Sequence, residues 1–285
     1  MTVQIVTDST ADLPLQIADD LGIKVVPLTV HFGTEVLHDG VDITPNEFYR
    51  RLELASVLPT TSQPTVGDFL NSYQESGAAG AGIVSIHISG KLSGTLNSAN
   101  QAKEQYTGPS QIVTVDSKLG SIALGLVAIA ASEAASEGHA TEKVAEIARE
   151  TSNRTGFFVL LDTLEYLEKG GRIGKAQAFV GSLLRVKPIL TAKDGAVHPL
   201  ERARSRSKGI ERLFDLVNEN APLARLGVVY STTPDEANDL ADRLKSLSPD
   251  GNVLLSQIGP VVGTHLGPGV IGVAFTTSTG PETPK

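Results

Sequence analysis

Short runs of β-branched and apolar residues alternate with helical patterns along most of the chain. The series opens with a predicted strand at Val3–Thr7, a helix that begins at Pro14 and a strand at Lys24–Val30. In Thr44-Pro45-Asn46-Glu47, a capping hydroxyl precedes a proline and an acid, so we expect another helix to start there. Alternating strands and helices of this kind indicate an α/β fold.

The same rhythm continues to the end of the chain. Further strands are expected at Gly82–Ile88, Gln111–Val115, Phe157–Leu160, Gly227–Tyr230, Val253–Gln257 and Val270–Phe275, and Pro188–Thr191 is expected to turn at Asp194-Gly195 into a returning strand. Further helices are expected at Thr95–Gln105, Ser121–Glu137, Thr141–Ser152, Thr163–Lys169, Lys175–Leu184 and Ser207–Asn218, and from Pro234 onwards. The Thr-, Gly- and Pro-rich segment Thr276–Lys285 is expected to be frayed.

A chain of 285 residues is long for a single core, and a polar break at Ser152–Gly156 offers a boundary. We therefore predict two α/β domains. Residues 1–155 form the N-terminal domain and carry the hydroxyl-rich loops, and residues 156–285 form the C-terminal domain and carry the basic loops and His265.

Composition narrows the classes of function. The net charge of -8 disfavours binding to nucleic acid or to an anionic membrane surface. The absence of Cys excludes disulfides, thiolate nucleophiles and zinc–thiolate or iron–sulfur sites. No basic stretch followed by an apolar one resembles a signal peptide, and no apolar run approaches the roughly 20 residues that span a bilayer, so a cytoplasmic location is expected. No conspicuous apolar stripe calls for a partner, which favours a monomer.

Two polar loops near the N-terminus are candidates for ligand binding. Asp8-Ser9-Thr10 follows the first strand, where ligands of parallel sheets usually bind, although Asp and Ser also cap helices. The segment Thr60–Thr65 contains four hydroxyls, more than one helix cap needs. Thr65 with Asp68 suffices to start the next helix, so Thr61 and Ser62 are spare donors unless the segment is an ordinary polar loop.

A third polar loop, Ser89–Thr95, joins a predicted strand to a predicted helix. Ser93 and the backbone N–H groups beside it would converge on a helix N-terminus, which attracts anions, or form a simple turn. The loop lacks the spacing of a Walker loop, a dinucleotide fingerprint or a nucleophile elbow.

The second half of the chain adds cations and a histidine. Lys169-Gly170-Gly171-Arg172-Ile173-Gly174-Lys175 carries three cations on a glycine-rich connection, and a second basic stretch holds Arg202, Arg204, Arg206 and Lys208. Either stretch could contact phosphate or an acidic partner, or be a solvated face. His265 lies in a predicted glycine-rich loop, where a structural histidine is the commoner case. No His, Asp and Glu set has metal-ligand spacing, so no metal is expected.

Taken in order, these segments resemble the DegV family. The resemblance covers nearly the whole chain and depends on Val6–Pro14, Thr61-Ser62-Gln63-Pro64, Ser93-Gly94-Thr95 and Leu167–Ile173. It implies two α/β domains with a ligand tunnel between them. The best understood family members are bacterial proteins that bind a long-chain fatty acid and present its carboxyl group to a separate ATP-dependent fatty acid kinase, which forms an acyl phosphate.

The resemblance also implies roles for individual residues. Thr61, Ser62, Ser93, Gly94 and His265 carry over as ligands of the carboxylate, with no further cofactor and no catalytic residue in this chain. Arg172 and Arg204 carry over as residues that face the kinase or phosphate. The second assignment is the weaker, because the family tends to have Arg-Thr-Arg-Lys-Lys where this chain has Arg204-Ser205-Arg206-Ser207-Lys208, so Arg202 and Arg206 stay alternatives. Transient membrane contact is compatible with such a role.

Two alternatives remain at this point. Ser93 as nucleophile and His265 as base would make a hydrolase or acyltransferase, although no third residue that would orient the histidine is evident. A regulatory domain that binds another small carboxylate would have a pocket without a long tunnel.

Overall fold

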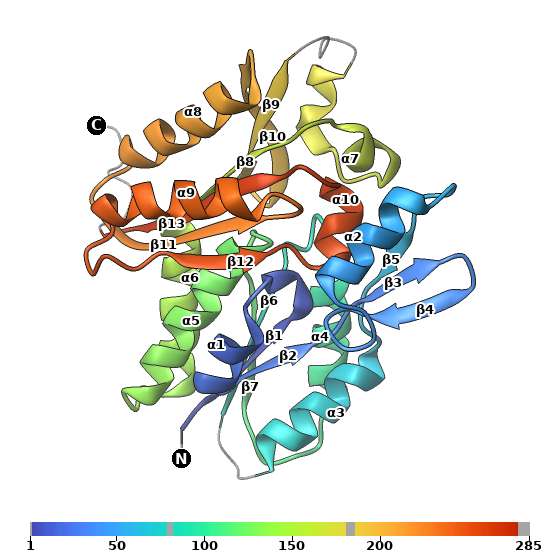
Figure 1. The fold of residues 1–285 in the computed structure, drawn as a ribbon. Coiled ribbons are helices and arrows are strands. Elements are labelled where there is room, and N and C mark those ends of the chain that lie inside the picture. Colours follow the sequence, from blue (N-terminus) through green and yellow to red (C-terminus); the bar gives the residue numbers. More distant parts are fainter. Residues whose placement is uncertain (1, 79–81, 181–185, 279–285) are drawn as a thin grey trace.

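The computed structural model describes residues 2–78, 82–180 and 186–278, which form an α/β fold with three sheets (Figure 1). The first sheet is parallel and has the strand order β2-β1-β6-β7. Its strands are β1 (Gln4–Asp8), β2 (Ile23–Val26), β6 (Ile83–His87) and β7 (Ile112–Asp116). The 3-10 helix η1 (Ser9–Ala11) and the helices α1 (Leu15–Asp20), α3 (Val66–Gly77), α4 (Thr95–Gln105), α5 (Ile122–Ser136) and α6 (Thr141–Arg154) connect and cover it.

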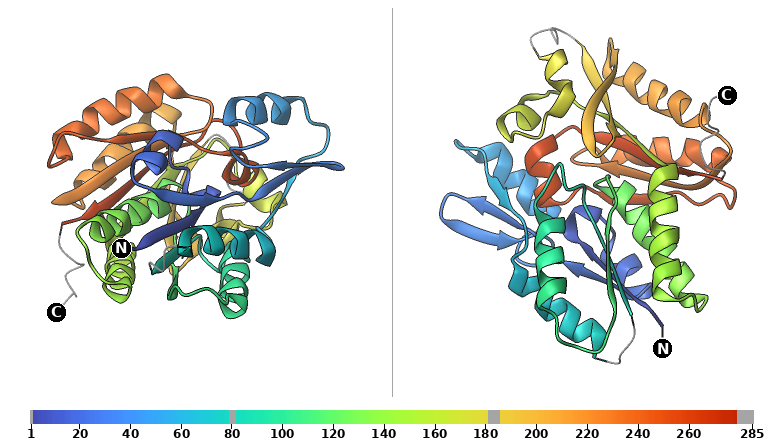
Figure 2. Two further views of the ribbon diagram at one scale, coloured as in Figure 1. Left: turned by 90° about the horizontal axis from the view of Figure 1, so that it is seen from below. Right: turned by 180° about the vertical axis from the view of Figure 1, so that it is seen from behind.

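Successive residues of these strands face opposite layers of helices, as the period of a strand requires. Val6 packs with the aromatic residues of α3, whereas its neighbour Ile5 packs with α5. Figure 2 shows α3 and α4 on one side of the parallel sheet and α5 and α6 on the other. The predicted βα rhythm is confirmed over this part of the chain, and Thr95–Gln105 matches a predicted helix to the residue.

The second sheet has six strands in the order β10-β9-β8-β13-β11-β12, of which only β11 and β12 are parallel neighbours. Its strands are β8 (Thr155–Leu160), β9 (Lys187–Lys193), β10 (Ala196–Ala203), β11 (Leu223–Tyr230), β12 (Leu254–Gln257) and β13 (Ile271–Thr277). The helices of this part are α7 (Glu165–Lys169), α8 (Arg206–Asn218), α9 (Pro234–Leu244) and α10 (Pro260–Leu266), with 3-10 helices η2 (Gly174–Phe179) and η3 (Lys245–Leu247). The predicted Asp194-Gly195 hairpin joins β9 to β10, and both of its residues have positive φ.

A third, small sheet was not predicted. It has the order β4-β3-β5, with β3 (Thr29–Phe32), β4 (Glu35–His38) and β5 (Thr60–Ser62), and α2 (Pro45–Leu54) packs on it through Phe48, Tyr49 and Leu52. The single strand predicted at Lys24–Val30 is therefore wrong. The chain leaves the parallel sheet at Val26, and Pro27, which has no N–H to donate to a ladder, separates β2 from β3.

Four other predictions need correction. The helix predicted at Lys175–Leu184 is the short 3-10 helix η2, and residues 181–185 lie outside the described part. The residues of the polar break at Ser152–Gly156, which were expected to lie between a helix and a strand, belong to these elements themselves, because α6 runs to Arg154 and β8 begins at Thr155. The loop around His265 is helix α10. Thr276 and Thr277 belong to β13, whereas residues 279–285 lie outside the described part.

Helix α5 is central to the packing because nearly all of its residues are buried between the two large sheets. It packs on β1 and β6 of one sheet and on β8, β11 and β13 of the other. All four strands of the parallel sheet end before Arg154, and all six strands of the other sheet begin at Thr155 or later. We keep the two-domain division at this point as a proposal that this arrangement supports.

Candidate functional site

A cavity of about 140 Å³ lies between the two large sheets and the small one. Its walls are mostly apolar and include Ile88, Leu92, Phe157, Val159, Leu190 and Leu266. Six polar residues singled out from the sequence also line it: Thr10, Thr61, Ser62, Ser93, Arg172 and His265. The fold thus brings hydroxyls, a guanidinium and an imidazole from distant segments to one apolar chamber.

These side chains are placed by several different elements. Thr61 and Ser62 belong to β5, which pairs with β3 so that Thr61 lies opposite Val30 and Ser62 opposite Thr29. Ser93 lies between β6 and α4, and Arg172 follows α7. His265 projects from the last turn of α10.

His265 is hydrogen bonded to Thr61 and is neutral. Its Nε2 lies 2.9 Å from Thr61 Oγ1, whereas its Nδ1 is buried without a partner among the described residues. Burial, and then the nearby positive charge of Arg172, lower the pKa of His265 from 6.5 to about 4. Because an orphaned buried N–H is rarer than an orphaned acceptor, we assign the proton to Nε2, so the ring donates to Thr61.

This geometry bears on the hydrolase alternative. In the part of the chain that the structure describes, Ser93 Oγ bonds Thr95 Oγ1 at 2.8 Å and His265 bonds Thr61, so no Ser93–His265 hydrogen bond is formed. With Nδ1 unpaired, no acid orients the ring either. The nucleophile and base that this alternative requires are therefore not assembled.

Gly94 lies next to a residue of the cavity wall but does not line the cavity itself. It is the N-cap of α4 and is not one of the described residues that line the cavity wall. A Cβ at this position would lie 2.6 Å from both terminal atoms of the Gln63 side chain, and Gln63 does line the wall. Gly94 therefore makes room for Gln63.

The arginines singled out in the second half of the sequence differ in their surroundings. Arg172 lines the cavity, and its Nε and one terminal nitrogen donate to the carbonyl oxygens of Leu92 and Gly170. Arg206 is paired with Glu236 and Asp162 and serves to join α8 to α9. Arg202 stacks on the ring of Phe179 at 4.2 Å. Arg204 is exposed between β10 and α8 and does not line the cavity.

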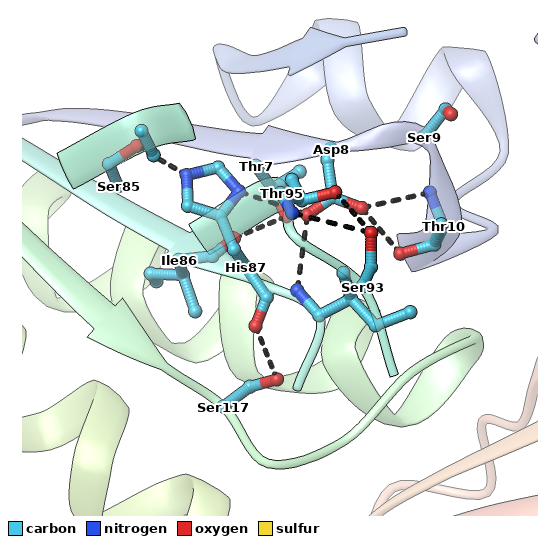
Figure 3. Close-up of polar contacts among 12 residues, drawn as sticks. Thr7, Asp8, Ser9, Thr10, Ser85, Ile86, His87, Ser93, Thr95 and Ser117 are labelled. Atoms are coloured by element: carbon cyan, nitrogen blue, oxygen red, sulfur yellow. Dashed lines mark hydrogen bonds and ion pairs between the residues drawn. The ribbon is translucent and has the colours of Figure 1, made fainter. Parts of the chain in front are cut away.

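A buried polar network that the sequence did not reveal supports this wall (Figure 3). Asp8 accepts hydrogen bonds from His87 Nδ1 at 2.9 Å and from the N–H groups of Ile88 and Thr10 at 3.1 Å. His87 Nε2 lies 2.6 Å from Ser85 Oγ, which accepts from the hydroxyl of Tyr73. Asp8 was expected to be a ligand residue or a cap, and the structure assigns it to fixing η1 and the start of the Ser93 loop.

Two further cavity residues, Gln63 and Ser121, were not assigned to the site from the sequence. Ser121 has a positive φ of 53° and precedes α5, a conformation that only the fold explains. Among the described residues, no cluster of His, Asp and Glu could hold a metal ion. No helix in the described ranges is long and apolar enough to cross a bilayer.

Fold and site together define an α/β protein that encloses an apolar cavity beside hydroxyls and a guanidinium. The chain belongs to the DegV family, whose model, described as an uncharacterised protein of the DegV family, matches residues 2–278. A DegV domain-containing protein of Streptomyces coelicolor is 38% identical over 279 residues, which are 96% of this chain and 98% of that protein.

Solved structures of DegV proteins have the same fold as this chain. A DegV family protein from Thermus thermophilus, described by its fatty acid binding, has a TM-score of 0.89 at 36% identity, with 97% of this chain and 100% of that chain covered. DegV from Bacillus subtilis, described as a fatty acid binding protein, has a TM-score of 0.89 at 33% identity, with 97% and 99% covered. The predicted family and fold class are confirmed.

Proposed function

We propose that this protein binds a long-chain fatty acid and presents its carboxyl group to a separate ATP-dependent kinase. The observation that carries the proposal is that Thr61, Ser62, Ser93 and Arg172 share one apolar cavity. The descriptions of the Thermus thermophilus and Bacillus subtilis structures as fatty acid binders support it.

The tail would supply most of the affinity. About fourteen methylenes at about 0.8 kcal/mol each give on the order of 11 kcal/mol of burial, against an association cost of about 4–15 kcal/mol. The cavity of about 140 Å³ is close to the roughly 150 Å³ that accommodates a benzene-sized ligand. A long tail therefore requires the aliphatic walls to rearrange around it.

The head group would be held by donors. Since His265 donates to Thr61, the Thr61 hydroxyl is left to donate to a carboxylate oxygen. Ser62 and Ser93 add two further hydroxyls. Each hydrogen bond to a charged group contributes about 1.5–3 kcal/mol, which favours a carboxylate held by these hydroxyls. In this scheme His265 acts mainly through Thr61.

The carboxyl group would then receive phosphate from the partner. Arg172 lines the same cavity as the head-group hydroxyls, and both Arg172 and Arg204 are exposed, so both can face a kinase. Arg206 is committed to Glu236 and Asp162, which leaves Arg204 the better second candidate. An acyl phosphate is a mixed anhydride, and the apolar walls would protect it from water.

Native mass spectrometry of the purified protein, followed by denaturing extraction, tests the ligand class. We expect a retained long-chain acid in wild type and in Thr61→Ser, and about 10- to 100-fold weaker binding of cis-parinaric acid by Thr61→Val, which lacks the hydroxyl. Absence of any retained acid after gentle purification, together with no binding of the probe, would contradict the proposal.

A further inference from the structure

The segment that leads into α10 is held by two buried carboxyl groups that the proposed function does not use. Asp12 Oδ1 accepts from the N–H of Gly259 at 2.9 Å, and Asp39 Oδ2 accepts from the N–H of Val261 at 3.4 Å. Asp12 directly follows η1 and Asp39 directly follows β4, whereas Gly259 and Val261 belong to the second half of the chain. The two acids thus bind one end of α10 to the first half.

Neighbouring contacts strengthen the same attachment. The Ser256 hydroxyl donates to the carbonyl oxygen of Asp12, and the Tyr49 hydroxyl donates to that of Ile258 at 3.2 Å. Four residues of α10, among them His265, line the cavity. The position of α10 therefore decides where the imidazole lies relative to Thr61.

We propose that Asp12 and Asp39 are positioning residues that fix α10 and thereby hold His265 Nε2 against the hydroxyl of Thr61. The expected effect of this positioning on ligand affinity rests on the proposed function, whereas the expected effect on the His265–Thr61 hydrogen bond does not. Neither acid touches the ligand. They act through the helix.

The acids can do this because burial favours their protonated form up to about pH 7. Burial raises the pKa of Asp12 to about 8 and that of Asp39 to about 7, and repulsion from Asp8 adds to both. The groups that face the pair are Asp8, the hydroxyls of Ser9 and Ser121, and Tyr49, whose own pKa is raised well above 10.0. Two neutral carboxyl groups can approach one backbone segment without the repulsion that two carboxylates would suffer.

Gly259 is fitted to this arrangement. A Cβ there would lie 3.0 Å from Asp39 Oδ1 and 3.1 Å from Asp12 Oδ1, so both carboxyl groups flank the same face of its Cα. Its φ of -69° is one that any residue adopts. Gly259→Ala is therefore permitted by the backbone, and the atoms nearest to the added methyl group are oxygens of the two carboxyl groups.

The experiment uses full-length protein labelled with ¹⁵N-histidine, in which the His265 ring signals are assigned with His265→Gln. In wild type at pH 6.5 we expect a neutral ring with a slowly exchanging Nε2 proton. Asp12→Asn and Asp39→Asn can still accept the N–H bonds and should preserve that signal. Asp12→Ala and Asp39→Ala should lose it and bind cis-parinaric acid at least tenfold more weakly. Asp19→Ala, on the exposed face of α1, is the matched control.

Gly259→Ala retains both acids and should shift the His265 signal in the same direction, which keeps the test valid if an Asp→Ala variant does not fold. Alanine variants with wild-type ring signals, or asparagine variants as impaired as the alanine ones, would overturn the proposal. If wild type fails to bind cis-parinaric acid while the ring signals respond as expected, the proposed function is wrong and the positioning role stands.

Discussion

At the scale of single residues, the polar side chains in and around the site fall into two groups. Some have their hydrogen bonds or ion pairs used within the protein, and others have a group left to bind a ligand. The Thr10 hydroxyl is committed to Asp8, and Arg206 is committed to Glu236. Thr61 is different, because His265 supplies the hydrogen bond that its oxygen accepts. Arg172 binds only carbonyl oxygens in the described structure, so its charge is not neutralised by an acid.

This difference leads to a prediction for Arg172. If its charge acts on the phosphate rather than on the tail, Arg172→Ala should retain wild-type lipid content but lower acyl-phosphate formation by a fatty acid kinase by at least tenfold. Lys175→Ala removes a nearby exposed cation that does not line the cavity and should leave both properties unchanged. Lipid analysis and a radiolabelled ATP assay give the two readouts. Equal loss of lipid and of product in Arg172→Ala would instead place the arginine among the ligand-binding residues.

Individual site residues were predictable where one segment held more polar groups of one kind than its local structure needs. Thr61 and Ser62 were singled out because their loop held more hydroxyls than a cap needs, and the structure puts both on the cavity wall. His87 gave no such signal, because it lies within an apolar strand and its partner Asp8 is 79 positions away in the sequence. Buried pairs of this kind depend on strand order, which a single sequence does not specify.

At the scale of elements, prediction succeeded where the pattern was long and failed where it was short. Helices with clear caps, such as those that begin after Thr44 and Thr65, were anticipated, and both threonines cap as expected. β5 has only three residues, all hydroxyl-bearing, so neither alternation nor hydrophobicity marked it as a strand. α10 was hidden by its glycines, although it carries His265.

Helix α5 allows a test of how tightly the elements pack. A Cβ at Gly125 would lie 2.8 Å from the carbonyl oxygen of Ala11 and 2.9 Å from a methyl of Leu13. Alanine would gain up to about 1 kcal/mol in helix propensity, but overpacking typically costs about 1–3 kcal/mol. We therefore expect Gly125→Ala to lower the free energy of unfolding by about 1–2 kcal/mol in denaturant titrations.

Gly67→Ala is the matched control for this substitution. Gly67 lies in the exposed first turn of α3, where a Cβ would meet only Thr65 Oγ1 at an ordinary 3.5 Å. We expect no loss of stability there. A Gly125→Ala variant as stable as Gly67→Ala would show that α5 has more room than the structure indicates.

At the scale of the whole molecule, the contacts between the two halves are concentrated around α5 and around the segment before α10. The first is an apolar contact and was foreseeable in kind, since a long apolar helix must be buried. The second depends on Asp12 and Asp39, which come from loops far apart in the sequence and have no apolar pattern. Buried carboxyl groups at such a contact make the stability of the whole fold sensitive to protons.

The direction of that sensitivity follows from the pKa shifts. Asp39 and Asp12 titrate near 7 and 8 in the folded protein but near 3.8 when exposed, so the folded state holds their protons more tightly. Their contribution to stability is therefore greatest on the acid side. It falls as the pH rises from about 4 to about 8, because the folded state then releases protons that the unfolded state has already lost. His265, whose pKa is lowered to about 4, acts oppositely, with stability lost as the pH falls below 6.5.

A double variant, Asp12→Asn with Asp39→Asn, separates these effects because asparagine cannot release a proton and His265 is common to both proteins. We expect the variant to be more stable than wild type at about pH 8.5, with the difference shrinking steadily towards about pH 4. Denaturant unfolding at several pH values measures the difference directly. A difference that does not change with pH would mean that the two carboxyl groups titrate normally in the folded state, and that neutral acids do not hold α10 in place.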